Sequence, residues 1–299
     1  MNNKRKPHIL AIILMFIWGI SYLSIKVVVD EVNPIQAAFY RFFLASIILF
    51  IILKRKFPEE KLIKEDKIKV ALSGLTGVAL YFLFENYSVY FTSASNVAVL
   101  ISSIPIFTLI TQRILFKEKL TIYKVAGTIL SMVGIVIIII SKGKLSLFST
   151  GTKGDLMALG AALCWVIYTI ITTSFKGNYK SITITTYQSI WGSIFLFPSV
   201  IFLKVTIPST KAIINILYLS LICSCIAYAL YIYCLESLGA TSITTYINLQ
   251  PIISLLSAKL FLNEKIMFIQ VVGSLIIILG VSIVSFTGKF SLNKCDEVV

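Results

Sequence analysis

The stretch ASNVAVLISSIPIFTLITQRILFKEKLTIYKVAGTILSMVGIVI, from Ala94 to Ile137, decides the fold, because the chain contains a second, related copy of it. The second copy is Ala240–Ile283, shifted by 146 positions. An internal repeat of this kind determines the architecture that the sequence predicts. Positions that keep the same residue include Ala94 and Ala240, Ile101 and Ile247, Pro105 and Pro251, Ile106 and Ile252, Leu109 and Leu255, Glu118 and Glu264, Lys119 and Lys265, Val125 and Val271, Gly127 and Gly273, and Gly134 and Gly280.

Each copy has the pattern of a hairpin that lies in a membrane. An apolar helix broken by one proline is followed by a Glu-Lys turn and by a second apolar helix with two glycines seven residues apart. The carboxylates Glu118 and Glu264 fall at the start of that second helix, where the helix dipole favours negative charge, so both Glu-Lys pairs are interpreted as structural. The glycines put small residues on one face, which favours close helix contact.

The composition excludes a water-soluble domain. Hydrophobic residues make up 58% of the 299 positions and charged residues only 13%, against roughly 45–50% and about 25% in soluble domains. A spanning helix needs about 20 apolar residues. The sequence therefore predicts an all-α integral membrane protein with ten transmembrane helices. The predicted spans are about 9–29, 35–53, 68–91, 94–116, 122–141, 155–174, 183–203, 212–235, 240–262 and 267–287.

A polar segment, Lys142–Gly154, divides these spans into two domains of five. Residues 9–141 form the first predicted repeat and residues 155–287 the second. Because each repeat has an odd number of spans, the second must lie upside down relative to the first. Two inverted five-helix repeats that meet at the midplane are typical of secondary transporters, although a duplication can also simply record how a gene grew.

The formal net charge of +14 does not indicate a nucleic-acid partner, because the basic residues stand in short loops between apolar spans. With the N-terminus inside, 18 of the 27 Lys and Arg residues fall in inner segments and 8 in outer segments, while Arg41 lies within a span. This positive-inside bias predicts a multi-pass protein of the plasma membrane, held in the lipid bilayer with both termini in the cytoplasm. The homo-oligomeric state stays open.

No pattern for metal, cofactor or catalytic chemistry is present in the sequence. The five cysteines have no metal-site spacing and are interpreted as packing residues. The one histidine, His8, has no catalytic partner near it in the sequence. Phosphate-binding loops, dinucleotide fingerprints, zinc-helix motifs and nucleophile elbows do not occur. We therefore expect no catalytic residue, no metal and no cofactor, and the protein is not predicted to be an enzyme.

Two prolines lie at matched depth in the two copies. Pro105 and Pro251 stand 11 residues into their spans, roughly 16 Å deep at 1.5 Å per residue and so close to the bilayer centre. Each proline frees the carbonyl four residues back, at Ile101 or Ile247. A free carbonyl at this depth must face protein or a water-filled cavity. The prolines are therefore either tolerated kinks or, as their symmetry favours, bends in gating helices.

Aromatic and amide side chains gather at the same depth. Trp18 and Trp165 lie about 9–10 residues into their spans, although tryptophan usually prefers the membrane interface. Their matched depth indicates either plain helix packing or a cavity in which flat ligands stack. Together with nearby tyrosines and amides they predict an aromatic, mostly uncharged pocket. The candidate substrate-binding residues are Trp18, Tyr22, Tyr81, Glu85, Trp165, Tyr168, Tyr228, Tyr231, Tyr246, Asn248 and Gln250, and Tyr40 and Tyr187 lie near them in depth.

Two charged residues are predicted to lie inside the membrane. Glu85 and Arg41 stand about 9 Å from the outer end of the third and second spans, as judged from helical rise. Intramembrane charges are functional candidates whose partner should be named, and we expect these two to pair with each other. The pair is either a static ion pair, or Glu85 exchanges protons or binds a substrate amine at the outer gate. Arg41 is assigned to gating or structure.

Short segments of both halves also resemble a known family. They are 92–98, 104–107, 117–121 and 127–134 in the first half, and 239–242, 249–251, 262–265 and 273–280 in the second. These segments are similar to the EamA repeat of the drug/metabolite transporter superfamily. The resemblance covers nearly the whole chain and implies ten helices in two inverted halves, around a cavity lined by spans one, three, four, six, eight and nine. It further implies export of amino acids, related metabolites or drugs, in many members by proton coupling or exchange.

These observations predict a secondary transporter that exports small amphipathic metabolites such as amino acids, by alternating access, with proton coupling through Glu85 as its sharper form. Efflux of drugs or toxic compounds and uptake of metabolites are alternatives within transport. A membrane enzyme would need converging nucleophiles or carboxylates, whereas one deep carboxylate is present. A sensor or scaffold without transport would normally add a soluble signalling domain, and the longest loop is only about Lys54–Lys69.

Overall fold

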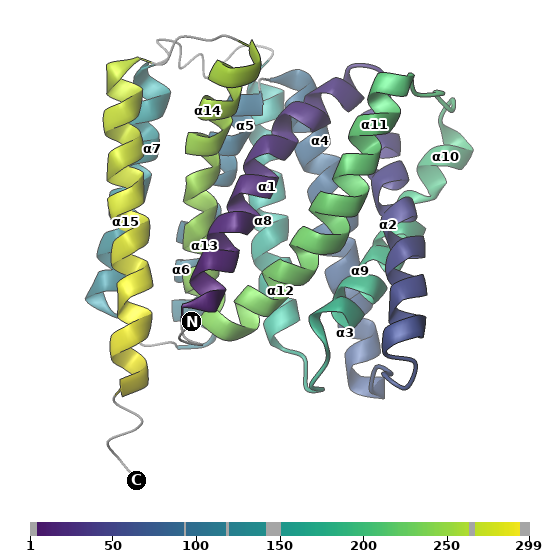
Figure 1. Cartoon of the computed structure of the whole chain (residues 1–299), viewed down its shortest axis with the longest axis horizontal. Coiled ribbons are helices and arrows are strands. Elements are labelled where there is room, and N and C mark those ends of the chain that lie inside the picture. The colour runs from purple at the N-terminus through teal and green to yellow at the C-terminus, as the bar shows by residue number, and fades with distance from the viewer. Residues whose placement is uncertain (1–4, 93, 118–119, 142–150, 263–266, 294–299) are drawn as a thin grey trace.

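In a computed structural model, the described residues are 5–92, 94–117, 120–141, 151–262 and 267–293, and within them the chain is helical, with no strand. In this part of the chain, six helices or helix runs are long and apolar enough to cross a membrane, and two further apolar helices are shorter. They pack side by side in one bundle (Figure 1). This confirms the all-helical membrane architecture expected from composition. For example, α1 (Lys6–Val29) and α2 (Pro34–Lys56) expose large apolar side chains to the outside of the bundle, as helices in contact with lipid do.

The helices follow the order of the two repeats. The first copy contains α1 (Lys6–Val29), α2 (Pro34–Lys56), α3 (Lys64–Gly74), the π-helical segment η1 (Leu75–Leu80), α4 (Tyr81–Phe91), α5 (Ala94–Ile101), α6 (Ile104–Leu115) and α7 (Ile122–Ser141). The second copy contains α8 (Gly151–Thr173), α9 (Ser181–Leu196), α10 (Pro198–Phe202), α11 (Thr210–Tyr218), the π-helical segment η2 (Leu219–Ile226), α12 (Ala227–Leu238), α13 (Ala240–Tyr246), the 3-10 turn η3 (Ile247–Leu249), α14 (Gln250–Leu262) and α15 (Phe268–Asn293). The predicted structural pairs Glu118-Lys119 and Glu264-Lys265 lie outside the described residues.

The seventh predicted span is shorter than expected. The sequence pattern favours a helix over 183–203, but α9 ends at Leu196 and the short helix α10 follows from Pro198. Proline has no N–H to donate and its ring collides with the preceding helical turn, so a helix normally ends before it. The apolar segment 183–203 is therefore divided between α9 and α10 and does not form one continuous helix.

Both proline-containing spans are broken in the middle. α5 ends at Ile101, and α6 starts afresh at Ile104 with Pro105 in its first turn. In the second copy, the chain passes from α13 through η3 into α14, which holds Pro251 at its second position. A proline is tolerated in the first turn of a helix because its missing N–H would have no partner there. The two prolines thus begin new helices instead of kinking continuous ones.

The third and eighth spans each contain a π-helical segment, which the sequence did not predict. η1 interrupts α3 and α4, and η2 interrupts α11 and α12. The last residues of these segments, Leu80 and Ile226, are 146 positions apart, which is the repeat shift. π-helical turns are rare and occur frequently at functional sites. Their presence at matched positions shows that the two copies share a backbone irregularity as well as a sequence pattern.

The equivalent helices α7 and α15 run antiparallel with their backbones in close contact. A Cβ atom built on Gly127 would lie 2.6 Å from the carbonyl oxygen of Gly280, and one on Gly134 would lie 2.6 Å from that of Gly273. Since 127 faces 280 and 134 faces 273, the two helices point in opposite directions. Figure 1 shows this pair at one edge of the bundle, beside the helices that enclose the centre.

Candidate functional site

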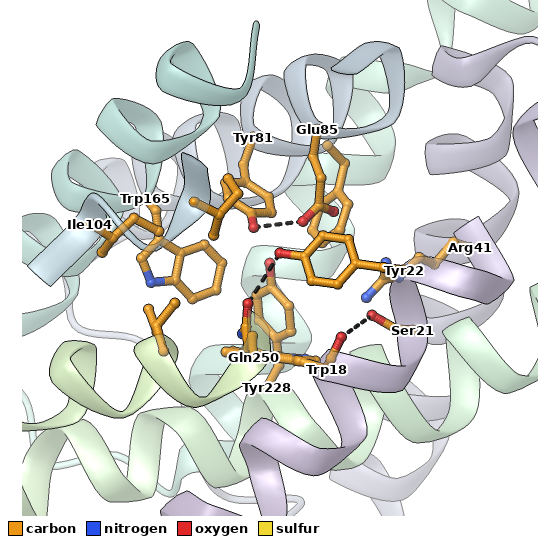
Figure 2. A pocket seen from close by; sticks show the side chains of 13 residues that line it. Trp18, Ser21, Tyr22, Arg41, Tyr81, Glu85, Ile104, Trp165, Tyr228 and Gln250 are labelled. Atoms are coloured by element: carbon orange, nitrogen blue, oxygen red, sulfur yellow. Dashed lines mark hydrogen bonds between the residues drawn. The ribbon is translucent and has the colours of Figure 1, made fainter. Parts of the chain in front are cut away.

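A cavity lies at the centre of the bundle, where helices of both copies meet. Its free volume is about 20 Å³, which is room for roughly one water molecule. The walls combine side chains from the long helices with residues at the two helix breaks (Figure 2). The lining residues are Trp18, Ser21, Tyr22, Arg41, Tyr81, Phe82, Glu85, Ile101, Ile104, Trp165, Tyr228, Ile247 and Gln250.

Aromatic rings from both copies form one wall. Trp18 and Trp165 meet edge to face, with ring centroids 5.3 Å apart and planes at 89°. Tyr228 lies 5.8 Å from Trp18 and 5.7 Å from Trp165, and Tyr81 lies 4.8 Å from Trp165. Edge-to-face contacts of this kind stabilise aromatic clusters and fix the ring orientations. The structure thus brings the two predicted midplane tryptophans into direct contact.

Polar groups line the same cavity beside the aromatic rings. The Tyr81 hydroxyl donates to Glu85 Oε1 at 2.7 Å, and the Tyr22 hydroxyl donates to Gln250 Oε1 at 3.1 Å (Figure 2). Tyr81 and Glu85 are four residues apart on α4, so both side chains lie on one helix face. Gln250 enters the cavity because η3 and the first turn of α14 bring it beside α1. Tyrosine, carboxyl and amide groups from three helices therefore converge on a single space.

The expected ion pair between Arg41 and Glu85 is not formed. Among the described residues, Arg41 and Glu85 do not approach within the 4.0 Å of an ion pair. Arg41 Nε donates instead to Ser224 Oγ at 2.7 Å, and its guanidinium lies 4.2 Å from the ring centroid of Phe82. Both residues line the same cavity, but the neighbouring segment η2 offers Arg41 a closer partner. The two opposite charges consequently stand apart on the wall of one cavity.

Glu85 and Arg41 each use only part of their hydrogen-bonding capacity within the described protein. Glu85 is 4% exposed and Arg41 3% exposed, so both are buried. The second carboxylate oxygen of Glu85 and the terminal nitrogens of Arg41 hydrogen-bond to no described residue, and neither group is among the polar atoms sealed inside protein. They therefore face the cavity, where a buried charge requires a compensating partner.

Two backbone carbonyls at the π-helical segments also meet cavity side chains. The Tyr228 hydroxyl donates to the carbonyl of Gly77 in η1 at 2.7 Å. Trp18 Nε1 donates to the carbonyl of Cys223 in η2 at 3.3 Å. Gly77 and Cys223 are 146 positions apart and so occupy the same place in the two copies. The sequence did not predict a role for Gly77 or Cys223, because nothing in it shows that their backbone carbonyls accept hydrogen bonds from side chains.

Tyr168 and Tyr231 lie behind the aromatic wall and not on its surface. Both are fully buried. Trp165 Nε1 donates to the Tyr231 hydroxyl at 3.1 Å, and the Tyr168 hydroxyl donates to Gln188 Oε1 at 3.3 Å. These two predicted substrate-binding residues therefore orient the wall but do not line the cavity.

Tyr246 and Asn248 are also placed away from the cavity. The Tyr246 hydroxyl hydrogen-bonds to His8 Nδ1 at 2.7 Å, and Asn248 Nδ2 donates to Ser131 Oγ on α7 at 2.5 Å. Their selection rested on predicted depth, and depth does not determine which face of a helix a side chain occupies. The prolines Pro105 and Pro251 likewise do not line the cavity, while the break residues next to them do.

We also searched the described part of the chain for groups of side chains that could hold a metal ion. No group of three or more His, Cys, Asp and Glu side chains is close enough to hold a metal ion among these residues. The four described cysteines, at 164, 223, 225 and 234, are buried and free. This agrees with their interpretation as packing residues.

Comparison with known proteins identifies the family. The sequence model of the EamA-like transporter family matches twice, at residues 5–140 and 152–286. Two uncharacterized transporters of Archaeoglobus fulgidus are 33% and 30% identical, each over 94% of this chain and 97% or 98% of their own length. The uncharacterized transporter YcxC of Bacillus subtilis is 24% identical over 94% of this chain and 93% of its own. A crystal structure with 14% identity shares the fold, at a TM-score of 0.74 over 97% of this chain and 98% of that one. The chain, with its duplicated membrane repeat, therefore belongs to the EamA-like transporter family.

Proposed function

We propose that this protein is a secondary transporter of the plasma membrane that exports small zwitterionic metabolites, of which amino acids are the leading class. The observation that carries the proposal is the pair of unpaired charges, Arg41 and Glu85, on the wall of one aromatic cavity. A substrate carboxylate would bind Arg41, whose planar guanidinium suits that group. A substrate ammonium would bind Glu85, and an apolar side chain would pack on Trp18 and Trp165.

The proposed mechanism is alternating access between two inverted five-helix halves. The antiparallel run of α7 and α15 supports inversion, since these are the last helices of the two copies. A free volume of about 20 Å³ is too small for an amino acid. Loading therefore requires the walls to separate, and the breaks beside Pro105 and Pro251 are points where the walls can move.

A more specific version of the proposal is that transport is coupled to protons through Glu85. Among the described residues, Glu85 alone places a carboxyl group on the cavity wall. A carboxylate that holds a substrate amine in one state and a proton in the other would exchange the two across the membrane. Arg41 would keep the substrate carboxylate in place during that exchange.

Counterflow in proteoliposomes tests the proposal. A panel of labelled amino acids, uncharged amides of the same amino acids, and nucleosides is measured with and without a pH gradient. We expect amino acids to exchange faster than their amides, because the amide lacks the carboxylate that Arg41 would bind. Glu85→Gln should abolish the response to the pH gradient and weaken amino-acid exchange at least tenfold. Glu236→Gln, a carboxyl group at the end of α12 and away from the cavity, is the matched control and should behave as wild type.

Two results would contradict the proposal. Equal exchange of amino acids and their amides would remove the carboxylate-binding role of Arg41. A correctly folded Glu85→Gln variant with unchanged exchange and an unchanged pH response would remove Glu85 from the mechanism. A panel without any exchanged solute would favour efflux of lipophilic compounds.

A further inference from the structure

A second pocket opens on the flank of the bundle, between α2 and α11. Its free volume is about 370 Å³. The walls are Phe43 and Leu44 of α2, Ile213 and Leu217 of α11, and residues 205–208 of the loop that precedes α11. Its α2 residues belong to the first half of that helix, and Figure 1 shows α11 beside α2. It is separate from the central cavity, with which it shares no lining residue.

The loop that forms the pocket is built for contact with lipid. Ile207 is 90% exposed and Val205 is 50% exposed, which is unfavourable in water. Measured along α2 at 1.5 Å per residue, Tyr40 and Leu44 lie roughly 9 and 15 Å from the helix start. Half of a hydrocarbon core that is about 30 Å thick is about 15 Å. These wall residues of α2 therefore lie within one leaflet, at the level of lipid acyl chains.

Positive charge flanks the loop of the pocket. Lys204 and Lys211 stand in sequence on either side of the wall residues 205–208, and both are exposed. Glu31 binds the same loop, and its carboxylate accepts hydrogen bonds from Ser209 N at 3.2 Å and Ser209 Oγ at 2.9 Å. Its neighbour Asp30 is paired with Lys26. Two lysines against the one remaining carboxylate leave a net positive charge, which attracts an anionic lipid headgroup.

We propose that this pocket binds an anionic phospholipid, with an acyl chain between α2 and α11 and the phosphate at Lys204 and Lys211. The Tyr40 hydroxyl donates to the carbonyl of Thr206 at 3.4 Å, which joins α2 to the loop of the pocket. The next residue along α2 is Arg41, which lines the central cavity. A lipid that packs against both α2 and the loop would restrain the part of α2 that carries Arg41.

Native mass spectrometry of the full-length protein tests the proposal. Delipidated protein is titrated with phosphatidylglycerol and, separately, with phosphatidylcholine. We expect one tightly bound phosphatidylglycerol and much weaker binding of phosphatidylcholine. The double variant K204Q/K211Q should bind phosphatidylglycerol roughly 25-fold more weakly, since each lysine near an anionic lipid surface contributes about fivefold. Leu217→Trp, which fills the pocket at a position 41% exposed, should abolish tight binding with both lysines present.

The double variant K153Q/K259Q is the matched control, because it removes the same charge from exposed lysines outside the pocket. Its lipid affinity should equal that of the wild type. Equal affinity for the two lipids, or equal loss in both double variants, would show that general charge and not this pocket attracts the lipid, and would overturn the proposal. If Leu217→Trp keeps its phosphatidylglycerol but loses transport of a lipophilic solute, the pocket belongs to that solute and the proposal is wrong.

Discussion

At the scale of single residues, two side chains of the cavity donate hydrogen bonds to backbone carbonyls of the π-helical segments. A π-helical turn leaves carbonyls out of the regular helical pattern, and in a membrane such a carbonyl needs a donor from elsewhere. Gly77 receives its donor from Tyr228 of the other copy, and Cys223 receives its donor from Trp18 of the other copy. Each half therefore supplies a hydrogen-bond donor to the π-helical segment of the other half. The aromatic residues of the cavity thus have a structural task besides any contact with substrate.

Tyr228→Phe tests this task. The Tyr228 side chain is 1% exposed, so without its hydroxyl the carbonyl of Gly77 is left buried and unpaired, at a cost of about 1–3 kcal/mol. We expect a lower unfolding temperature in detergent and slower transport. Tyr233→Phe is the control on the same helix, because the Tyr233 hydroxyl donates to no described residue. Equal shifts in the two variants would mean that the hydrogen bond to Gly77 contributes nothing.

The sequence predicted the residues of the cavity better than it predicted their pairings. Counting along a span predicts the depth of a residue, and of the residues chosen in this way Trp18, Trp165 and Glu85 line one cavity. The direction of a side chain around its helix depends on how neighbouring helices pack, which no local pattern contains. For that reason Asn248 donates to Ser131 on α7 and Arg41 donates to Ser224, which the sequence did not predict.

At the scale of helices, α7 and α15 depend on glycine for their close approach. Gly134→Ala would put a methyl group 2.6 Å from the carbonyl oxygen of Gly273, so one helix must shift. We expect a loss of about 1–3 kcal/mol in unfolding free energy, typical of overpacking. Gly160→Ala is the matched control, since its methyl group would meet the Phe84 ring at 3.5 Å, an ordinary contact distance. Thermal unfolding of purified protein checks both, and comparable losses would refute the close contact as the cause.

The two kinds of helix irregularity differ in how far the sequence reveals them. The breaks in the fourth and ninth spans could be predicted, because Pro105 and Pro251 remove a helical donor wherever they stand. The π-helical segments could not, because η1 and η2 contain ordinary helix-compatible residues. Their wider turns are stabilised by donors from the other repeat, so they depend on tertiary contacts that form only when the halves meet.

At the scale of the whole molecule, carboxylates tie the halves together at both ends of the bundle. At the end where α3 begins, the fully buried Asp66 accepts from Lys176 N, from Gly177 N at 2.9 Å and from the Tyr179 hydroxyl at 2.9 Å. At the other end, the exposed Glu31 accepts from Ser209 alone. Burial and the larger number of hydrogen bonds make the Asp66 contact the stronger of the two.

Asp66→Asn should therefore destabilise the protein far more than Glu31→Gln. An amide at 66 has one acceptor oxygen instead of two, so at least one of these donors loses its partner at the buried side chain, at a cost of about 1–3 kcal/mol. The exposed contact of Glu31 should be worth less than about 1 kcal/mol. Limited proteolysis of the loop between α8 and α9, together with thermal unfolding, would measure the difference. Similar losses for the two variants would contradict the assignment of Asp66 as the stronger tie.

The orientation of the bundle in the membrane can be tested with two introduced cysteines. Asn178 and Thr210 are exposed and stand at opposite ends, since the loop of Asn178 meets Asp66 at the start of α3 while Thr210 follows Ser209, which binds Glu31 at the end of α1. The four described native cysteines are buried, so a Cys295→Ser background leaves little other labelling. If both termini are cytoplasmic, a membrane-impermeant maleimide added to intact cells labels Thr210→Cys, and Asn178→Cys reacts only after permeabilisation. The reverse pattern would place the termini outside and invert the assignment of the gates. Labelling of both sites from outside would contradict the membrane crossing between them, and with it the alternation of two inverted halves.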